Sequence, residues 1–155
     1  PPTLEIIDEM VRAGVNEIAI NLEFYNREVA ANIIPGKAKD SREKYFEALE
    51  HGVKLLGNKG AVRSILIVGL EDYTDTLQGV RELVTRGVTP ILSIFKPLKG
   101  TQLEDASPPK LEDLILVWEE SQKICDEHAQ TLGPLCAQCQ NNTLTIPVNK
   151  LYLTK

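Results

Sequence analysis

The sequence predicts an α/β fold in which three parallel strands alternate with helices. Three runs rich in branched apolar residues, at 17–22, 62–70 and 89–95, are typical of buried strands. Segments with helical spacing of apolar residues separate these runs, and glycines follow the segments closely. Strands separated by helices imply right-handed crossovers, and therefore a parallel sheet.

Two helices are expected before the central strand. Thr3 can cap the first, which would extend to residue 13. Asp40, with Glu43 three residues later, resembles a capping box that opens a second helix reaching residue 56. The intervening segment 24–39 is longer than a strand-to-helix connection needs, and we expect it to be a functional loop at the rim of the sheet.

Two further helices are expected after the central strand. The first spans about 74–86. The last begins near Pro108-Pro109, because prolines are tolerated in a first helical turn, and reaches about residue 129. The apolar positions expected to form its packing stripe are Leu111, Leu114, Ile115, Trp118 and Ile124. Beyond it, 143–146 are expected to add a short strand.

The composition argues against several classes of protein. The chain has 155 residues, of which 43% are hydrophobic, so it can bury the core of one domain. A net charge of −5, without a basic patch, argues against a nucleic-acid partner. No apolar run approaches the roughly 20 residues that cross a membrane. The three cysteines do not suggest a secreted disulfide framework. We therefore expect a cytoplasmic protein.

A sheet of three strands leaves two edges with unpaired amide groups. A closed barrel of the TIM type needs about eight strands. The chain is therefore expected to be part of a TIM-type (β/α) barrel, or to cover its edges by forming a homo-oligomer. It begins with Pro1-Pro2 and runs directly into a helix, which we interpret as the start of a trimmed part of a longer protein.

Three motifs stand at the ends of the three predicted strands. They are Asn21-Leu22-Glu23, Ile67-Val68-Gly69-Leu70-Glu71 and Lys96-Pro97-Leu98-Lys99-Gly100-Thr101. In order and placement they resemble the radical S-adenosylmethionine superfamily, and within it the biotin-synthase-like branch. The corresponding strand ends of that branch read Asn-Leu-Asp, Ile-Val-Gly-Leu-Gly-Glu and Val-Lys-Val-Lys-Gly-Thr-Pro-Leu. The resemblance covers about residues 18–103.

The resemblance implies which residues would bind S-adenosylmethionine. Asn21 and Glu23 would contact its ribose. The branch has an aspartate where this chain has Glu23, and the glutamate side chain is longer, so this contact would need a longer reach. Gly69 and Leu70 would lie against the adenine. In this branch a basic residue binds the methionyl carboxylate, and the candidates here are Lys37, Lys39, Arg42 and Arg63.

The motif CxxxCxxC, which holds the [4Fe–4S] cluster of this superfamily, is absent from the sequence. The resemblance therefore implies that residues 1–133 are the C-terminal half of the barrel and that 134–155 form a cysteine-containing tail. The cluster ligands would come from an N-terminal half upstream of this chain. The whole enzyme would cleave S-adenosylmethionine reductively and abstract a hydrogen from a small-molecule substrate, and this chain alone is not expected to be active.

The end of the chain offers a candidate metal site. Its residues are Cys125, His128, Cys136 and Cys139. Three cysteines and a histidine are compatible with tetrahedral zinc or with an auxiliary iron–sulfur cluster. In the alternative interpretation Cys125 is a small buried apolar residue, and the CxxC pair is free or redox-active.

Two other functions stay open at this stage. One is a self-associating α/β binding domain without radical chemistry. The other is a non-radical barrel enzyme, although the sequence shows neither an obvious strand-borne lysine nor a glycine-rich phosphate loop. In an alternative interpretation, the polar residues at the strand ends are solvent-exposed and bind no ligand. Gly69 would then only form the turn that leads into the next helix.

Overall fold

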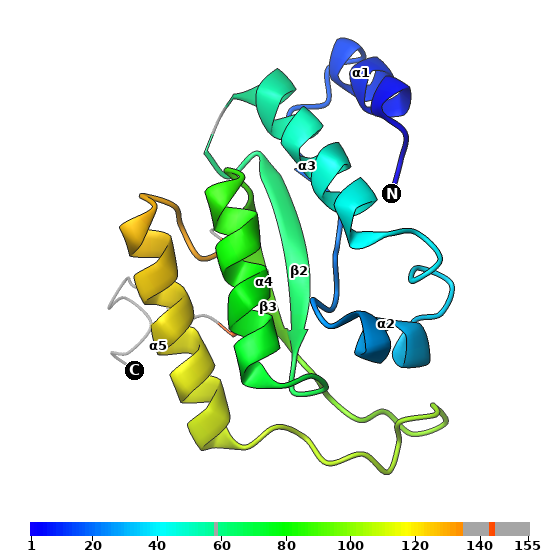
Figure 1. Ribbon diagram of the computed structural model, residues 1–155, viewed down its shortest axis with the longest axis vertical. Coiled ribbons are helices and arrows are strands. Elements are labelled where there is room, and N and C mark those ends of the chain that lie inside the picture. Colours follow the sequence, from blue (N-terminus) through cyan, green and yellow to red (C-terminus); the bar gives the residue numbers. More distant parts are fainter. Residues whose placement is uncertain (58, 135–142, 145–155) are drawn as a thin grey trace, which may run out of the picture.

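The computed structural model describes residues 1–57, 59–134 and 143–144. Its sheet has the order β1 (Ile18–Ala19), β2 (Val62–Val68), β3 (Thr89–Ile94), and both neighbouring pairs are parallel (Figure 1). The predicted parallel α/β sheet is confirmed. β1 is shorter than predicted because its ladder with β2 breaks after Ala19 and resumes only as a bridge between Glu23 and Leu66.

Four helices lie where the sequence predicts them. They are α1 (Leu4–Arg12), α3 (Arg42–Leu56), α4 (Tyr73–Thr85) and α5 (Leu111–Glu127). A fifth, α2 (Arg27–Ile33), lies within the segment that was expected to be a loop. The side chain of Asn26 caps it by accepting hydrogen bonds from the backbone N–H groups of Glu28 and Val29.

The predicted start of α3 is wrong by one residue. Ser41 is the cap, since its hydroxyl accepts a hydrogen bond from the backbone N–H of Lys44 at 3.3 Å. The carboxylate of Asp40 instead contacts the amino group of Lys44, also at 3.3 Å. The hydrogen bonds of Ser41 and Asp40 both involve Lys44, so the first turn of α3 is held from two sides.

The apolar stripe predicted for α5 is partly wrong. Leu111 is 72% exposed and Ile115 is 49% exposed. The buried residues of this helix are Val117, Ser121, Ile124 and Cys125. The helix packs against α4 through this second face, and the exposed leucine and isoleucine point away from the core.

The helices cover one face of the sheet. α3 and α4 contact β2, α5 packs beside α4, and α1 packs beside α3 (Figure 1). Alternate residues of β2, beginning at Val62, are buried under these helices, whereas Arg63, Ile65 and Ile67 are only partly covered. All-parallel sheets are usually covered on both faces. Two of the three partly covered residues on this second face, Ile65 and Ile67, are apolar.

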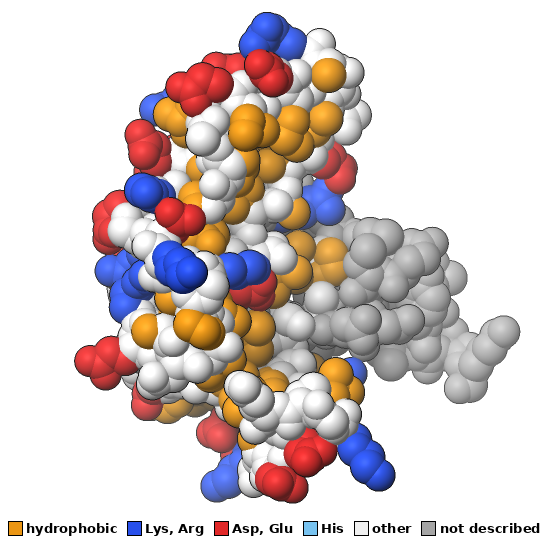
Figure 2. All heavy atoms as spheres, turned by 90° about the vertical axis from the view of Figure 1, so that its right-hand side faces the viewer, with side chains coloured by type: hydrophobic (Ala, Val, Ile, Leu, Met, Phe, Trp, Pro, Cys, Tyr) orange, Lys and Arg blue, Asp and Glu red, His pale blue; other side chains and the backbone are white. Residues whose placement is uncertain are grey.

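The two edges of the sheet differ. Ile91 of β3 bridges to Gly133, and Ser93 bridges to Thr143 in antiparallel fashion. The backbone N–H of Leu144 donates to the carbonyl of Leu92 at 2.8 Å, and residues 145–146 of the predicted tail strand lie outside the described residues. Within the described ranges, no strand pairs with the outer edge of β1. Figure 2 views this side of the molecule, and hydrophobic side chains gather near its top, where Figure 1 places α1.

None of the helices in the described ranges is both long enough and apolar enough to cross a membrane.

Candidate functional site

The strand β1 continues into a bulge at the motif Asn21-Leu22-Glu23. The backbone N–H of Ile20 donates to the carbonyl of Arg63 at 3.1 Å, and the next ladder bond runs from Glu23 to the carbonyl of Ile65 at 2.9 Å. A regular ladder would use Leu22 for that bond. Its N–H donates instead to the buried hydroxyl of Ser64 at 2.9 Å. Bulges re-aim side chains at the ends of strands, and they are common beside binding sites.

Glu23 has a strained backbone at this bulge. Its φ is 68°, in the left-handed region that glycine, asparagine and aspartate adopt more easily than glutamate. Its carboxylate pairs with the amino group of Lys37 from the segment after α2. A left-handed residue that is not glycine is a reason to look for a functional role, because the surrounding fold must compensate for the strain.

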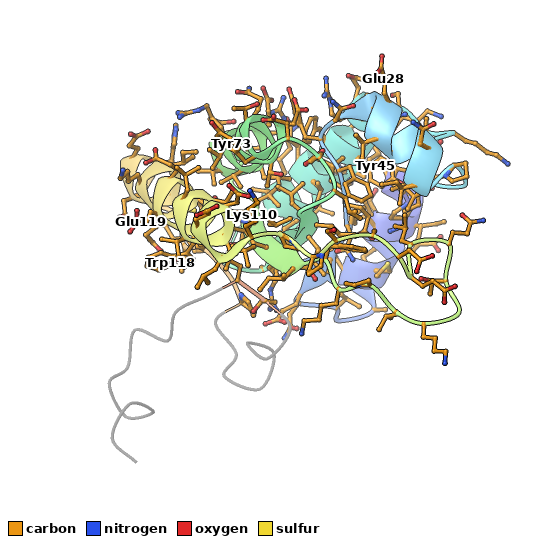
Figure 3. All side chains as sticks on the ribbon, turned by 90° about the horizontal axis from the view of Figure 1, so that it is seen from below. Glu28, Tyr45, Tyr73, Lys110, Trp118 and Glu119 are labelled. Carbon is orange, nitrogen blue, oxygen red and sulfur yellow. The ribbon has the colours of Figure 1, made fainter. Side chains whose placement is uncertain are left out.

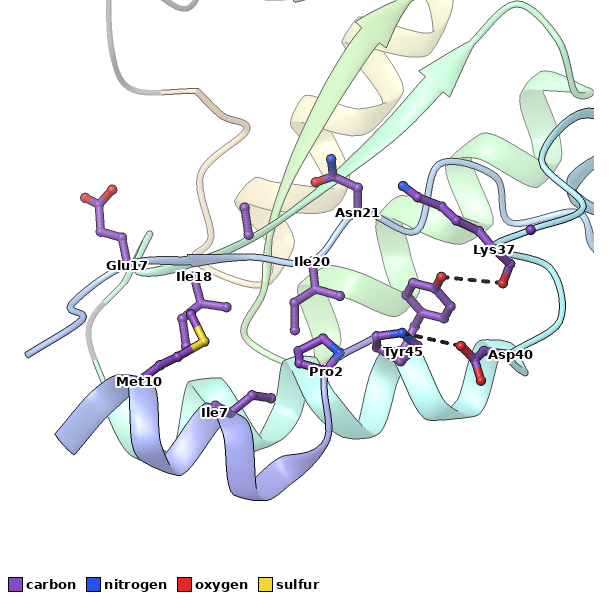
Figure 4. Close-up of a pocket in the computed structure, with 13 residues that line it drawn as sticks. Pro2, Ile7, Met10, Glu17, Ile18, Ile20, Asn21, Lys37, Asp40 and Tyr45 are labelled. Atoms are coloured by element: carbon purple, nitrogen blue, oxygen red, sulfur yellow. Dashed lines mark hydrogen bonds and ion pairs between the residues drawn. The ribbon is translucent and has the colours of Figure 1, made fainter. Parts of the chain in front are cut away.

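Asn21 places a buried acceptor at the same strand end. Its side-chain oxygen Oδ1 is buried and has no hydrogen-bond partner among the described residues. Leaving such an atom unpaired costs roughly 1–3 kcal/mol, so a ligand that donates a hydrogen bond here would be favoured. Asn21 and Lys37 line a pocket of about 560 Å³ together with Ile20 and Tyr45 (Figure 4).

Glu71 ties the segment after the bulge to the end of β2. Its carboxylate accepts hydrogen bonds from the backbone N–H of Asn26 at 2.9 Å, that of Tyr25 at 3.3 Å and the hydroxyl of Thr76 at 3.1 Å. Burial raises the pKa of the Glu71 carboxyl, and these donors partly oppose the rise. The sequence placed Glu71 in a motif without giving it a role, since its partners lie in another element.

Gly69 ends β2 with a φ of 111°. A Cβ atom at this position would lie 2.8 Å from two side-chain carbons of Pro109, so the glycine is needed for the close approach of the segment that precedes α5. The adenine contact predicted for Gly69 and its neighbour Leu70 stays a prediction. Any ligand there would have to use a different side of the strand end from the one that Pro109 covers.

The four basic candidates are distributed over different places. Lys37 reaches Glu23, and Lys39 is exposed in the same segment. Arg42 holds the backbone of the rim: its guanidinium donates to the carbonyl of Tyr25 at 3.0 Å and lies 4.1 Å from the centroid of that ring. The structure therefore brings Lys37 to the predicted ribose ligands, and Arg42 to the backbone beside them.

Arg63 lies in β2 opposite Ala19 of β1. It pairs with Glu17 and donates to the carbonyl of Gly60, before the start of β2. These two contacts direct its guanidinium toward the residues before β1 and β2, and not toward the motif at 21–23.

The candidate metal ligands are only partly described. Cys125 is fully buried, and burial raises the pKa of its thiol to about 12, which disfavours the thiolate that a metal needs. His128 is exposed at the end of α5. Cys136 and Cys139 lie outside the described residues. Among the residues that are described, no three His, Cys, Asp or Glu side chains are grouped to hold a metal ion.

No protein-family model and no solved structure matches the chain. Over 127 residues, or 81% of its length, the chain is 29% identical to a protein of Chlorobaculum limnaeum named bacteriochlorophyllide c C-7(1)-hydroxylase. The chain spans about a third of that relative, 31% of its length. The relative is an enzyme by its name, and the chain is therefore similar to part of a hydroxylase.

Proposed function

We propose that this chain is part of a radical S-adenosylmethionine enzyme and that the carboxyl end of β1 binds the nucleoside part of the cofactor. The order of the three strand-end motifs supports the superfamily. The similarity to a hydroxylase over most of the chain agrees with it, since hydroxylation at carbon breaks a carbon–hydrogen bond. The cluster ligands would belong to a segment outside this chain, because the sequence lacks CxxxCxxC.

The observation that carries the proposal is the buried, unpaired Oδ1 of Asn21, two residues before Glu23 in the same bulge. Both are acceptors at a strand end, and a ribose offers two neighbouring hydroxyl donors. Asn21 would accept from one hydroxyl and Glu23 from the other. Lys37 would orient the carboxylate of Glu23 through their ion pair.

S-adenosylmethionine and a reduced [4Fe–4S] cluster together supply the chemistry of hydrogen abstraction. The described residues would bind the cofactor, orient it and shield it from water. Ser64 and Glu71 fix the backbone on either side of Glu23, at 2.9 Å from Leu22 and from Asn26 respectively. Ile65 and Ile67, on the partly covered face of the sheet, would help exclude water from a barrel interior.

We propose that the sheet is one part of a TIM-type barrel. Its partly covered face would be the interior, and the N-terminal half of the same protein would supply a strand for the open edge of β1. That arrangement would cover the unpaired amide groups of the edge. It would also enclose the carboxyl end of β1, at the end of a barrel where ligands usually bind.

Calorimetric titration with S-adenosylmethionine tests the proposed site. Asn21→Ala should weaken binding about tenfold or more, because it removes a buried hydrogen bond to the ligand. Asn16→Ala, at an exposed asparagine before β1, is the matched control and should leave the affinity unchanged. Equal affinities for the wild type and Asn21→Ala would overturn the site. A parent sequence without a three-cysteine cluster motif would overturn the enzyme class.

A second candidate is a self-associating domain, which the open β1 edge favours. Ile6 and Met10 of α1 are exposed beside this edge, at 48% and 37%. Two chains that paired through it would bury these side chains and satisfy the edge amides. Sedimentation equilibrium separates the candidates: a tight dimer that Met10→Asp dissociates would support self-association, whereas a monomer at micromolar concentrations would support the proposed barrel half.

A further inference from the structure

A separate cavity of about 360 Å³ opens between α2 and the segment that follows β3. Asn32 and Ile33 contribute from α2, and Phe95 and Lys96 from the residues directly after β3. Seen from below, the segment after β3 runs along the same end of the molecule as α2 (Figure 3). The cavity therefore stands at the rim that carries Asn21 and Glu23, but its walls come from other residues.

One side of this cavity is apolar. Phe95 is buried, Ile33 and Leu103 are partly buried, and Leu98 is 64% exposed. A single exposed leucine needs no explanation, but four apolar side chains that share one hollow are typical of a binding site. The volume lies within the range of roughly 300–1,000 Å³ found for small-molecule sites.

The loop that carries Leu98 is held in place by its own hydrogen bonds. The hydroxyl of Thr101 donates to the carbonyl of Leu98 at 2.7 Å, and the carboxylate of Glu104 accepts from the backbone N–H of Gly100 at 2.7 Å. These bonds fix a tight turn, so the apolar wall exists before any ligand arrives. A preformed wall reduces the entropy that binding must offset.

The polar side of the cavity favours an anion. Lys96 is its one charged lining residue in the described structure, and no carboxylate lines it, although the chain carries a net charge of −5. Asn32, Thr101 and Gln102 add neutral polar groups. The nearby carboxylate of Glu104 is already occupied by the N–H of Gly100. A ligand with an apolar body and one acidic group matches this lining.

We propose that this cavity binds the apolar body of the enzyme's substrate and that Lys96 pairs with an acidic group on it. The substrate class is thereby a hydrophobic acid, which occupies the rim beside the cofactor. The inference rests on the proposed function, because the ligand of this cavity is a substrate only if the chain is part of an enzyme. The binding property itself depends only on the cavity and can be measured on this chain alone.

Two fluorescent probes that differ by one acidic group test the pairing. They are 8-anilinonaphthalene-1-sulfonate and its neutral analogue N-phenyl-1-naphthylamine. Lys96→Gln should weaken the binding of the anionic probe about fivefold and leave the affinity of the neutral probe unchanged, because only the anionic probe has a charge that Lys96 can pair. Lys99→Gln is the matched control, since Lys99 is exposed on the same loop without lining the cavity, and should change neither affinity.

Amide NMR shifts must place the anionic probe at Ile33, Phe95 and Leu98. The substitution Leu98→Asp must weaken the binding of both probes. Shifts concentrated on the exposed apolar face of α5, or equal losses for Lys96→Gln and Lys99→Gln, would overturn the proposal. Displacement of the probe by S-adenosylmethionine would assign the cavity to the cofactor and overturn it too. The Asn21→Ala titration fails or succeeds independently, so the two proposals can be told apart.

Discussion

The backbone N–H of Leu22 donates to the hydroxyl of Ser64, at 2.9 Å, where a regular parallel ladder would use a carbonyl. The serine is fully buried and lies on the neighbouring strand. This bond satisfies the amide that the bulge removes from the ladder. The conformation of the candidate cofactor ligands Asn21 and Glu23 therefore depends on a side chain that is itself out of reach of any ligand.

Ser64→Ala should lower the free energy of unfolding by roughly 1–3 kcal/mol, because it leaves a buried N–H without an acceptor. Urea unfolding measures the change. Ser107→Ala, at an exposed serine, is the control and should change the stability by less than about 0.5 kcal/mol. A neutral Ser64→Ala would mean that the bulge is held by other contacts.

Glu23→Gly should raise the free energy of unfolding by up to about 1 kcal/mol, since glycine adopts a φ of 68° without strain. The lost ion pair with the half-exposed Lys37 offsets about 0–1 kcal/mol of this gain. The same substitution should weaken the binding of S-adenosylmethionine.

Ala129→Gly is the matched control for that experiment. Its φ of 53° is also left-handed, and it lies beyond α5, away from the rim. It should gain stability without any change in ligand affinity. A Glu23→Gly protein with lower stability, or with unchanged affinity, would show that the strained backbone at this position serves no binding role.

Gly69→Ala should be destabilising by roughly 2 kcal/mol or more, because the added methyl group meets Pro109 at 2.8 Å and the φ is unfavourable for alanine. Pro109→Gly removes the carbons that the methyl group would meet. In a double-mutant cycle the two substitutions should therefore show a coupling free energy of roughly 0.5–3 kcal/mol. Additive effects would indicate that backbone strain at residue 69 explains the whole loss.

The pH dependence of the free energy of unfolding should reflect the ionisation of the buried Glu71 carboxyl. Its pKa is raised by burial, so the folded protein retains a proton that the unfolded chain loses above about pH 4.3. Stability from this group is therefore present at low pH and falls as the pH rises through the raised pKa. Urea unfolding between about pH 4 and 7 should show this slope in the wild type and less of it in Glu71→Gln. Identical slopes would contradict the role of burial.

Asp72 provides a comparison with the opposite sign. The hydroxyl and N–H of Thr74 hold the pKa of its carboxyl below the ordinary value. Its contribution is therefore present above the unfolded pKa of about 3.9 and is lost as the pH falls. Asp72→Asn should flatten the pH dependence of stability at acid pH. Glu71→Gln should instead change it at pH values closer to neutral.

The strands and most helices were predictable because alternation and helical spacing depend on residues that are close in sequence. The rest depends on partners elsewhere in the chain. α2 is short, and its cap at Asn26 was hidden in a segment that looked like a loop. The exposed side of α5 was misassigned because Leu111 and Ile115 have helical spacing, and spacing does not say which face meets α4.

The sequence predicts which residues stand at the strand ends, but not the geometry there, and the role of these residues as ligands stays a prediction. Asn21 and Glu23 were found from their place at a strand end. The bulge that orients them requires Ser64, and the fixed backbone after it requires Glu71, both from across the sheet. The contact between Gly69 and Pro109 likewise joins residues far apart in sequence, which no local pattern reveals.

The most direct measurement is an amide NMR titration of the labelled chain with S-adenosylmethionine. We expect shifts that saturate with one affinity and are largest at 21–26 and 69–71, the two strand ends that Glu71 joins. Asn21→Ala should move the midpoint of these shifts to about tenfold higher ligand concentration or beyond, while leaving the spectrum of the free chain otherwise intact. Saturating ligand without shifts at these residues, or with shifts concentrated elsewhere, would contradict a cofactor site at the carboxyl end of β1.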